Sequence, residues 1–206
     1  PVPRWRQDCD VPPPAQLIHS PYDLEARYSL KRGMAWVGYK EHMTETCDAD
    51  TPHVITHVET TPATTPDDNM VDTLHAALET TALLPRDHLV DCGYTDAAIL
   101  VESARQYGVN IIGPVAADPS WQAREETGFD NSAFTIDWAT RTATCPRGKQ
   151  STKWHPDRDR TGQEVIQIRF AYKDCQACAV RSACTRAKTQ PRTLAVRPQL
   201  YHEALQ

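Results

Sequence analysis

The stretch HLVDCGYTDAAILVESARQYGVNIIG, residues 88–113, decides the fold class of this chain. His88–Asp91 has the apolar character of a short buried strand, and residues 109–113 repeat that character. Between them, residues 96–107 carry apolar side chains at helical spacing, and Gly108 is the type of residue that ends a helix. A strand, a helix and a strand in this order predict a βαβ unit with parallel strands and a right-handed crossover.

An antiparallel hairpin and a helix are expected before the βαβ unit. Residues 36–46 and 54–58 are extended in character and are joined by a polar, turn-rich segment, which predicts a hairpin. Thr65–Asp68 has the features of a helix start: a capping threonine, a proline at the first helical position and two acids at the positive end of the helix dipole. Apolar residues at helical spacing follow from Val71 to Leu78. The whole order predicts an α/β fold.

The chain after Pro114 is expected to form a small β-rich module. Residues 134–144 read as a hairpin and 165–170 as a strand, with 149–161 as a loop between them. We therefore expect four parts: a proline-rich arm at 1–20, an α/β core at 21–114, a β-rich cysteine module at 115–190 and a C-terminal segment at 191–206.

Composition excludes some classes and favours others. No apolar run approaches the roughly 20 residues of a membrane-spanning helix, so an integral membrane protein of that kind is excluded. No secretory signal opens the sequence, so a cytoplasmic location with reduced thiols is expected. The net charge of −5 conceals a basic segment, because residues 141–197 hold 13 Lys and Arg but only 4 Asp and Glu.

A basic segment in an otherwise acidic chain predicts contact with nucleic acid. The alternative is that the segment is only a solvent-exposed charged surface. The residues expected to contact DNA are Arg147, Lys149, Lys153, Arg181, Arg186 and Lys188.

Asp91 is the first candidate for chemistry. It stands at the carboxyl end of a predicted parallel strand, which is the edge where open α/β sheets bind ligands. A carboxylate in that place can hold Mg²⁺, whereas an Asp close to a glycine can also be a simple turn former.

Four of the seven cysteines lie in the basic segment and form the second candidate site. Cys175 and Cys178 have the Cys-x2-Cys spacing that can bind one Zn²⁺, and Cys145 and Cys184 would complete a tetrahedral set of thiolates. The spacing is irregular for a standard zinc finger, so packed or free thiols remain the alternative.

Several motifs together resemble the insertion-sequence transposases of the DDE class. These motifs are SPYDLEAR (20–27), WVGYK (36–40), HMTETC (42–47), HLVDCGY (88–94), GPV (113–115) and SWQAR (120–124), followed by the cysteine module. The resemblance implies an RNase H-like mixed sheet and DNA, as transposon ends and target, for a partner. It also implies three catalytic carboxylates that hold two Mg²⁺ ions for phosphoryl transfer.

The same resemblance predicts an incomplete catalytic set. Asp91 matches the second carboxylate, but the chain has no Asp-Ser-Thr or Asp-Gly-Thr motif before the 36–40 strand, and Glu203 is poorly placed for the third. We therefore expect a truncated transposase that lacks the first strand and the last helix of the fold and is inactive alone. The alternatives are a non-catalytic zinc-bearing DNA-binding module and a stand-alone nuclease that uses Asp23, Asp91 and another acid. Self-association into a homo-oligomer stays open.

Overall fold

The structure is a computed structural model that describes residue 7 and residues 10–205. The chain divides into two compact units, which we call unit 1 and unit 2. Unit 1 contains the described residues up to Tyr94 together with Glu102–Gly113, and unit 2 contains Thr95–Val101 and the described residues from Pro114 onwards. Within the described residues, no helix is both long and apolar enough to cross a membrane.

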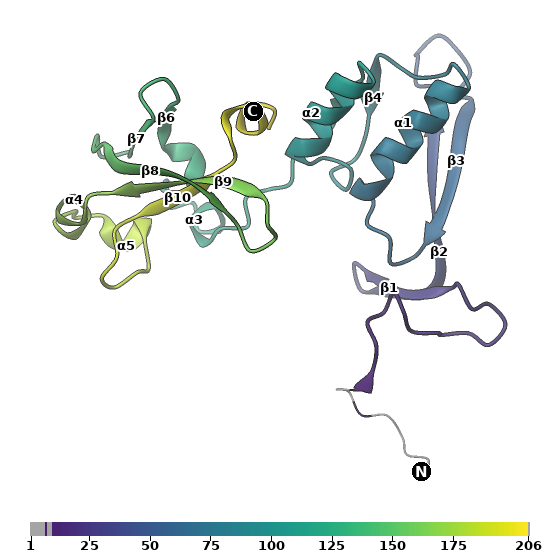
Figure 1. The fold of residues 1–206 in the computed structure, drawn as a ribbon, viewed down its shortest axis with the longest axis horizontal. Helices are drawn as coiled ribbons and strands as arrows, with labels where there is room; N and C mark the ends of the chain where they lie inside the picture. The colour runs from purple at the N-terminus through teal and green to yellow at the C-terminus, as the bar shows by residue number, and fades with distance from the viewer. Residues whose placement is uncertain (1–6, 8–9, 206) are drawn as a thin grey trace. The chain divides into compact units, whose positions relative to one another are not determined.

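Unit 1 begins with a three-stranded antiparallel sheet in the order β1-β2-β3 (Figure 1). Its strands are β1 (Arg27–Lys31), β2 (Met34–Glu45) and β3 (Ile55–Pro62). Arg32 and Gly33 join the first two strands with φ angles of 52° and 80°, the left-handed values of a tight two-residue hairpin turn. The predicted hairpin is confirmed as β2 and β3, whereas β1 was not anticipated.

The helix after the hairpin starts later than the sequence predicted. A short 3-10 turn, η2 (Asp68–Met70), leads into α1 (Val71–Thr80), which buries Val71, Leu74 and Leu78 as the spacing required. Figure 1 shows α1 alongside β3. Asp67 stands at the N-cap position of η2, where its side chain makes no capping hydrogen bond.

The βαβ unit is confirmed. The strands β4 (Asp87–Leu89) and β5 (Asn110–Ile112) pair in parallel, and α2 (Ala97–Gln106) connects them. Among the described residues, this pair shares no ladder with the β1-β2-β3 sheet. Unit 1 thus has two separate sheets rather than one continuous mixed sheet.

Unit 2 is built on an antiparallel sheet in the order β10-β9-β8 (Figure 1). Its elements after α2 are α3 (Trp121–Arg124), η3 (Asn131–Ala133), β6 (Thr135–Asp137), β7 (Thr142–Thr144), β8 (Ser151–Arg158), β9 (Glu164–Phe170), α4 (Tyr172–Gln176), α5 (Arg181–Cys184), β10 (Thr193–Val196) and α6 (Gln199–Glu203). The β6–β7 hairpin and β9 match the predicted elements.

The core of unit 2 lies on one face of this sheet. It consists of Phe134, Ala143, Ile168, Phe170, Leu194 and Val196, all buried. Cys145, Cys175 and Cys184 pack against this cluster. The cysteine segments therefore lie directly over the core of unit 2.

Three parts of the chain differ from the expected plan. Residues 151–158, expected in a loop, form β8, and Pro156 is tolerated there because β8 is an edge strand. Residues 193–196, expected in a separate C-terminal segment, form β10 and pair with β9 of the same sheet. The expected arm at 1–20 lies partly outside the described residues, and residues 11–20 form no helix or strand.

Candidate functional site

Asp91 lies just beyond the carboxyl end of β4. The Val90 amide still donates to the Ile112 carbonyl at 2.9 Å, so the parallel ladder runs up to the residue before Asp91. The chain then turns, and the Gly93 amide donates to Asp91 Oδ1 at 2.7 Å. The side chain is exposed, as a ligand-binding carboxylate at this edge requires.

Asp67 is a second carboxylate near the Asp91 turn, and the sequence reading missed it. A Cβ atom placed on Gly93 would lie 2.9 Å from Asp91 Oδ1 and 3.2 Å from Asp67 Oδ2. Both carboxylates therefore crowd the same glycine, and a larger residue there would displace one of them.

Asp67 is an ion-pair partner rather than an open ligand. Lys40 Nζ lies 2.8 Å from Asp67 Oδ1, and Lys31 Nζ lies 3.3 Å from Oδ2. Burial alone would raise the pKa of Asp67, but the two lysines outweigh it and the pKa is lowered. Both oxygens thus already have cationic partners.

A cavity of about 240 Å³ adjoins Asp91 and is lined by residues of β2, α1 and the β4 turn. Inside it, His42 Nδ1 lies 2.6 Å from the Tyr94 hydroxyl, and His42 Nε2 lies 3.1 Å from Thr61 Oγ1. Burial lowers the pKa of His42, and burial with the carboxylates of Asp67 and Asp91 raises the pKa of Tyr94 to about 12. The cavity wall is therefore uncharged near neutral pH apart from Asp91.

The described residues do not form the Mg²⁺ site that the family resemblance implies. No three His, Cys, Asp or Glu side chains in the described part of the chain are arranged to hold a metal ion. The Asp67 carboxylate, which lies at the same glycine as Asp91, is held by lysines. Asp23 accepts hydrogen bonds from the Tyr39 hydroxyl and the amides of Glu25 and Ala26, which is a local structural role.

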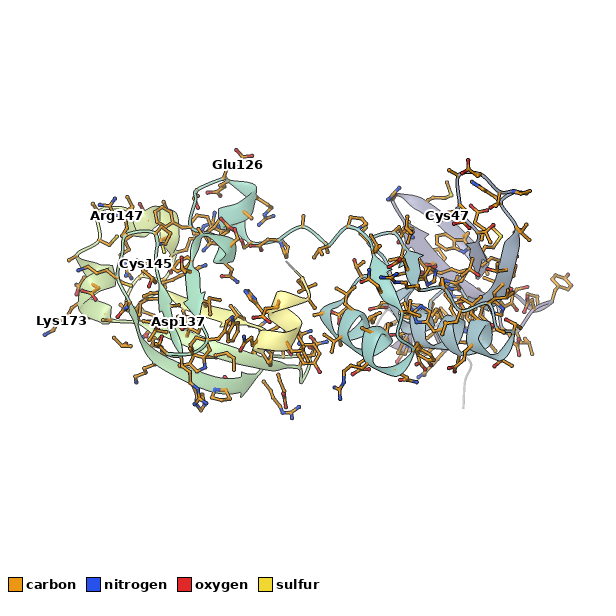
Figure 2. All side chains as sticks on the ribbon, turned by 90° about the horizontal axis from the view of Figure 1, so that it is seen from above. Cys47, Glu126, Asp137, Cys145, Arg147 and Lys173 are labelled. Atoms are coloured by element: carbon orange, nitrogen blue, oxygen red, sulfur yellow. The ribbon has the colours of Figure 1, made fainter. Side chains whose placement is uncertain are left out.

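The four candidate zinc ligands meet around one cavity in unit 2. This cavity, of about 40 Å³, is lined by Cys145, Cys175, Cys178 and Cys184 together with apolar and basic side chains. Helices α4 and α5 lie together at one end of the unit 2 sheet (Figure 1). Figure 2 shows Cys145 and Arg147 at that same end, near Lys173 of α4.

The Cys145 turn presents its sulfur to a backbone donor. The Gly148 amide donates to the Cys145 carbonyl at 2.8 Å, and the Lys149 amide donates to Cys145 Sγ at 3.4 Å. The Cys-Pro-Arg-Gly run at 145–148 therefore forms a turn that holds the sulfur next to a backbone amide.

Two arginines from this cavity are fixed by main-chain carbonyls. Arg181 Nη2 donates to the carbonyls of Ala187 and Gln190 at 2.7 and 3.0 Å. Arg192 donates to the carbonyls of Cys184 and Phe129, both at 3.3 Å. Burial raises the pKa of the Cys184 thiol, although the Arg192 guanidinium opposes this shift.

The six predicted DNA-contacting residues fall into two groups. Arg181 is bound within the unit, and Arg186 stacks 4.3 Å from the centre of the Trp121 ring while pairing with Glu125 at 2.7 Å. These two have structural partners, and Lys149 Nζ also lies 4.0 Å from Asp174 Oδ1. The side chains of Arg147, Lys149, Lys153 and Lys188 are exposed.

Lys153 belongs to a basic surface that includes Arg169, which sequence reasoning missed. The two residues are cross-strand partners on β8 and β9 and line an open hollow of about 830 Å³. Like charges directly opposite each other destabilise a sheet, so this pair is unfavourable unless an anion lies between them. The alternation of the 164–170 strand could have shown that Arg169 points away from the core.

Comparison with known proteins gives one match. Residues 144–206 match the family described as the transposase DDE domain. This stretch runs from the end of β7 through all four clustered cysteines and β8, β9 and β10. No curated protein and no solved structure matches the chain.

Proposed function

We propose that this chain acts on DNA in transposition, as a relative of the DDE transposases. The observation that carries the proposal is the match of residues 144–206 to the transposase DDE domain. DNA is the partner, and the cytoplasm, where thiols stay reduced, is the expected location.

Unit 1 supports this proposal through the position of Asp91. A carboxylate that follows a parallel strand, at the edge of a βαβ unit, is where the DDE class carries its second metal ligand. We propose that the two sheets of unit 1 are two halves of an RNase H-like mixed sheet. Their lack of a shared ladder is what a missing central strand would produce.

Asp91 alone does not supply two-metal catalysis. Two divalent ions in that mechanism stabilise both the attacking and the leaving oxygen, which needs several carboxylates at fixed spacing. Asp67, the nearby candidate, is neutralised by Lys31 and Lys40. We therefore propose that these 206 residues contribute Asp91 and DNA contacts but do not cut DNA by themselves.

The outward face of the unit 2 sheet is the proposed DNA contact. Lys153 and Arg169 stand opposite each other across an open hollow, and a phosphate between them would relieve their repulsion. Contacts of this kind are to the backbone of the duplex, so they bind with little sequence preference.

A salt titration of duplex binding tests this function. The unaltered chain should bind a duplex at low salt, with affinity falling steeply as salt rises. The double variant Lys153→Ala, Arg169→Ala should lose about two units from the slope of log affinity against log salt. Arg158→Ala is the matched control, because Arg158 is an exposed arginine of β8 that pairs with Glu164. Absent binding at low salt, or an equal loss in the control, would contradict the proposal.

The second candidate function is a non-catalytic DNA-binding module. The observation that favours it is the absence, among the described residues, of any group arranged to hold a catalytic metal. The two candidates share the unit 2 surface and differ in whether Asp91 has a role. A chain to which the other two catalytic carboxylates of a related transposase have been added would favour the first candidate if it cleaves DNA. Asp91→Ala should then abolish that cleavage.

A further inference from the structure

We propose that unit 2 binds one Zn²⁺ through the thiolates of Cys145, Cys175, Cys178 and Cys184, with Arg181 and Arg192 as the charge partners of the site. The first observation is that all four sulfur-bearing residues line one small cavity. Its volume of about 40 Å³ exceeds the space that one water needs, so an ion fits without opening the core.

The fold brings these residues together from distant parts of the sequence. Cys145 follows β7, whereas Cys175 lies on α4, Cys178 lies just after it and Cys184 ends α5. The β8–β9 hairpin lies within the 29 residues between the first two cysteines and returns the chain to the same place. The fold thus brings together four thiols that are far apart in the sequence, and four cysteines are a ligand set typical of structural zinc.

Basic side chains around the cavity, Arg181 and Arg192 among them, offset the charge of the site. Four thiols that bind one Zn²⁺ release four protons and leave a centre with a net charge of −2. Arg181 and Arg192, which line the same cavity, supply a charge of +2, and the other charged residues of the lining, Arg147, Lys149 and Asp174, add a net charge of +1. Two guanidinium groups with fixed main-chain contacts therefore offset the buried charge.

Unused hydrogen-bond donors point to the same conclusion. Arg181 Nη1 and Arg192 Nε are buried and have no hydrogen-bond partner, and they are the two such side-chain atoms among the described residues of unit 2. A buried donor without an acceptor is costly. Thiolates held by zinc in this cavity would provide acceptors for both, as the Lys149 amide already has one in Cys145 Sγ.

The thiols must turn towards the centre of the cavity when the ion binds. No three His, Cys, Asp or Glu side chains of the described chain are already arranged for a metal. A tetrahedral site needs Zn–S distances near 2.3 Å, which rotation about the cysteine side-chain bonds would have to produce. The site is closed by four protein ligands, so the role of zinc is to stabilise unit 2.

Metal analysis of the full chain tests the proposal. The chain purified under reducing conditions should carry one zinc per molecule, and Co²⁺ in its place should give the visible absorption of a tetrahedral thiolate site. Cys178→Ser and Cys145→Ser should each lose stoichiometric zinc. Cys47→Ser is the matched control, since Cys47 is exposed and Figure 2 shows it in unit 1.

The zinc affinity of arginine variants tests the charge-partner role. Arg192→Ala should weaken zinc binding by about 10–100-fold, and Arg192→Lys should recover part of it by restoring the charge. Equal zinc affinity in the Arg192→Ala chain would overturn the charge-partner role.

Absent zinc and an absent cobalt spectrum in the unaltered chain would overturn the site itself. Because the inference rests on unit 2 alone, duplex binding measured on the same samples separates it from the proposed function. A zinc-bearing chain that binds no DNA contradicts only the function, and a zinc-free chain that binds DNA contradicts only the site.

Discussion

At the scale of single residues, the chemistry of this protein is decided by which side chains already have partners. Asp67 was explained from the sequence as part of a helix start, but in the folded chain its carboxylate pairs with two lysines. Arg186, a predicted DNA contact, stacks on Trp121 and pairs with Glu125. Asp91 stays exposed where the βαβ pattern placed it. Sequence spacing located Asp91 because the signal is local, whereas the partners of Asp67 and Arg186 are distant in sequence.

A buried histidine pair in unit 1 gives a pH prediction. His75 on α1 is fully buried, and its Nε2 lies 3.0 Å from His88 Nδ1. Burial and the neighbouring His88 lower the pKa of His75 to about 4. The unfolded chain therefore takes up a proton before the folded chain does, so the unfolding free energy should fall as pH drops from about 6.5 to 4.

Hydrogen exchange of the α1 amides measures this effect. His75→Gln should make the unfolding free energy depend less on pH. The dependence that remains comes from His42 and His88, because burial also lowers their pKa values. His155→Gln, an exposed position on β8, should leave the α1 amides unchanged. Equal protection factors for the α1 amides at pH 7 and pH 4.5 would show that His75 does not titrate as described.

At the scale of elements, local patterns predicted the strands in which apolar and polar residues alternate and the helices with apolar residues at helical spacing. The 54–58 and 165–170 strands and the βαβ unit were found as predicted, because each has an apolar face or a clear turn signal. β8 was missed because Pro156 and its charged neighbours hide the alternation. β10 was missed because its pairing with β9 is a long-range contact.

The stability of unit 2 should depend strongly on substitutions on the core-facing side of its sheet and only weakly on those on the other side. Ile168 is fully buried at the centre of β9, so Ile168→Ala should lower the unfolding free energy by about 2–5 kcal/mol. Its neighbour Gln167 lies on the opposite face, and Gln167→Ala should cost less than about 0.5 kcal/mol. Urea unfolding followed by tryptophan fluorescence measures both, since Trp154 packs on this core. Equal costs in the two variants would mean that the core has been misplaced.

At the scale of the whole molecule, the two units carry different parts of the proposed function. Unit 1 holds the carboxylate at the end of a parallel strand, and unit 2 holds the basic face, the cysteine cavity and the stretch that matches the transposase DDE domain. The sequence predicted the α/β class and the convergence of the cysteines. It did not reveal the opposed Lys153 and Arg169, because that pairing depends on the register of β8 against β9.

The most direct test is to incubate the purified 206-residue chain with supercoiled plasmid and Mg²⁺ at low salt, and to read binding and nicking in one gel. We expect the plasmid to be bound and to stay uncut, because the carboxylate that the described residues place near Asp91, that of Asp67, is paired with Lys31 and Lys40. Asp91→Ala should bind the plasmid equally well, since the proposed DNA surface lies in unit 2. Nicking that requires Mg²⁺ and disappears in Asp91→Ala would contradict the account, because it would show that these residues assemble a complete catalytic site.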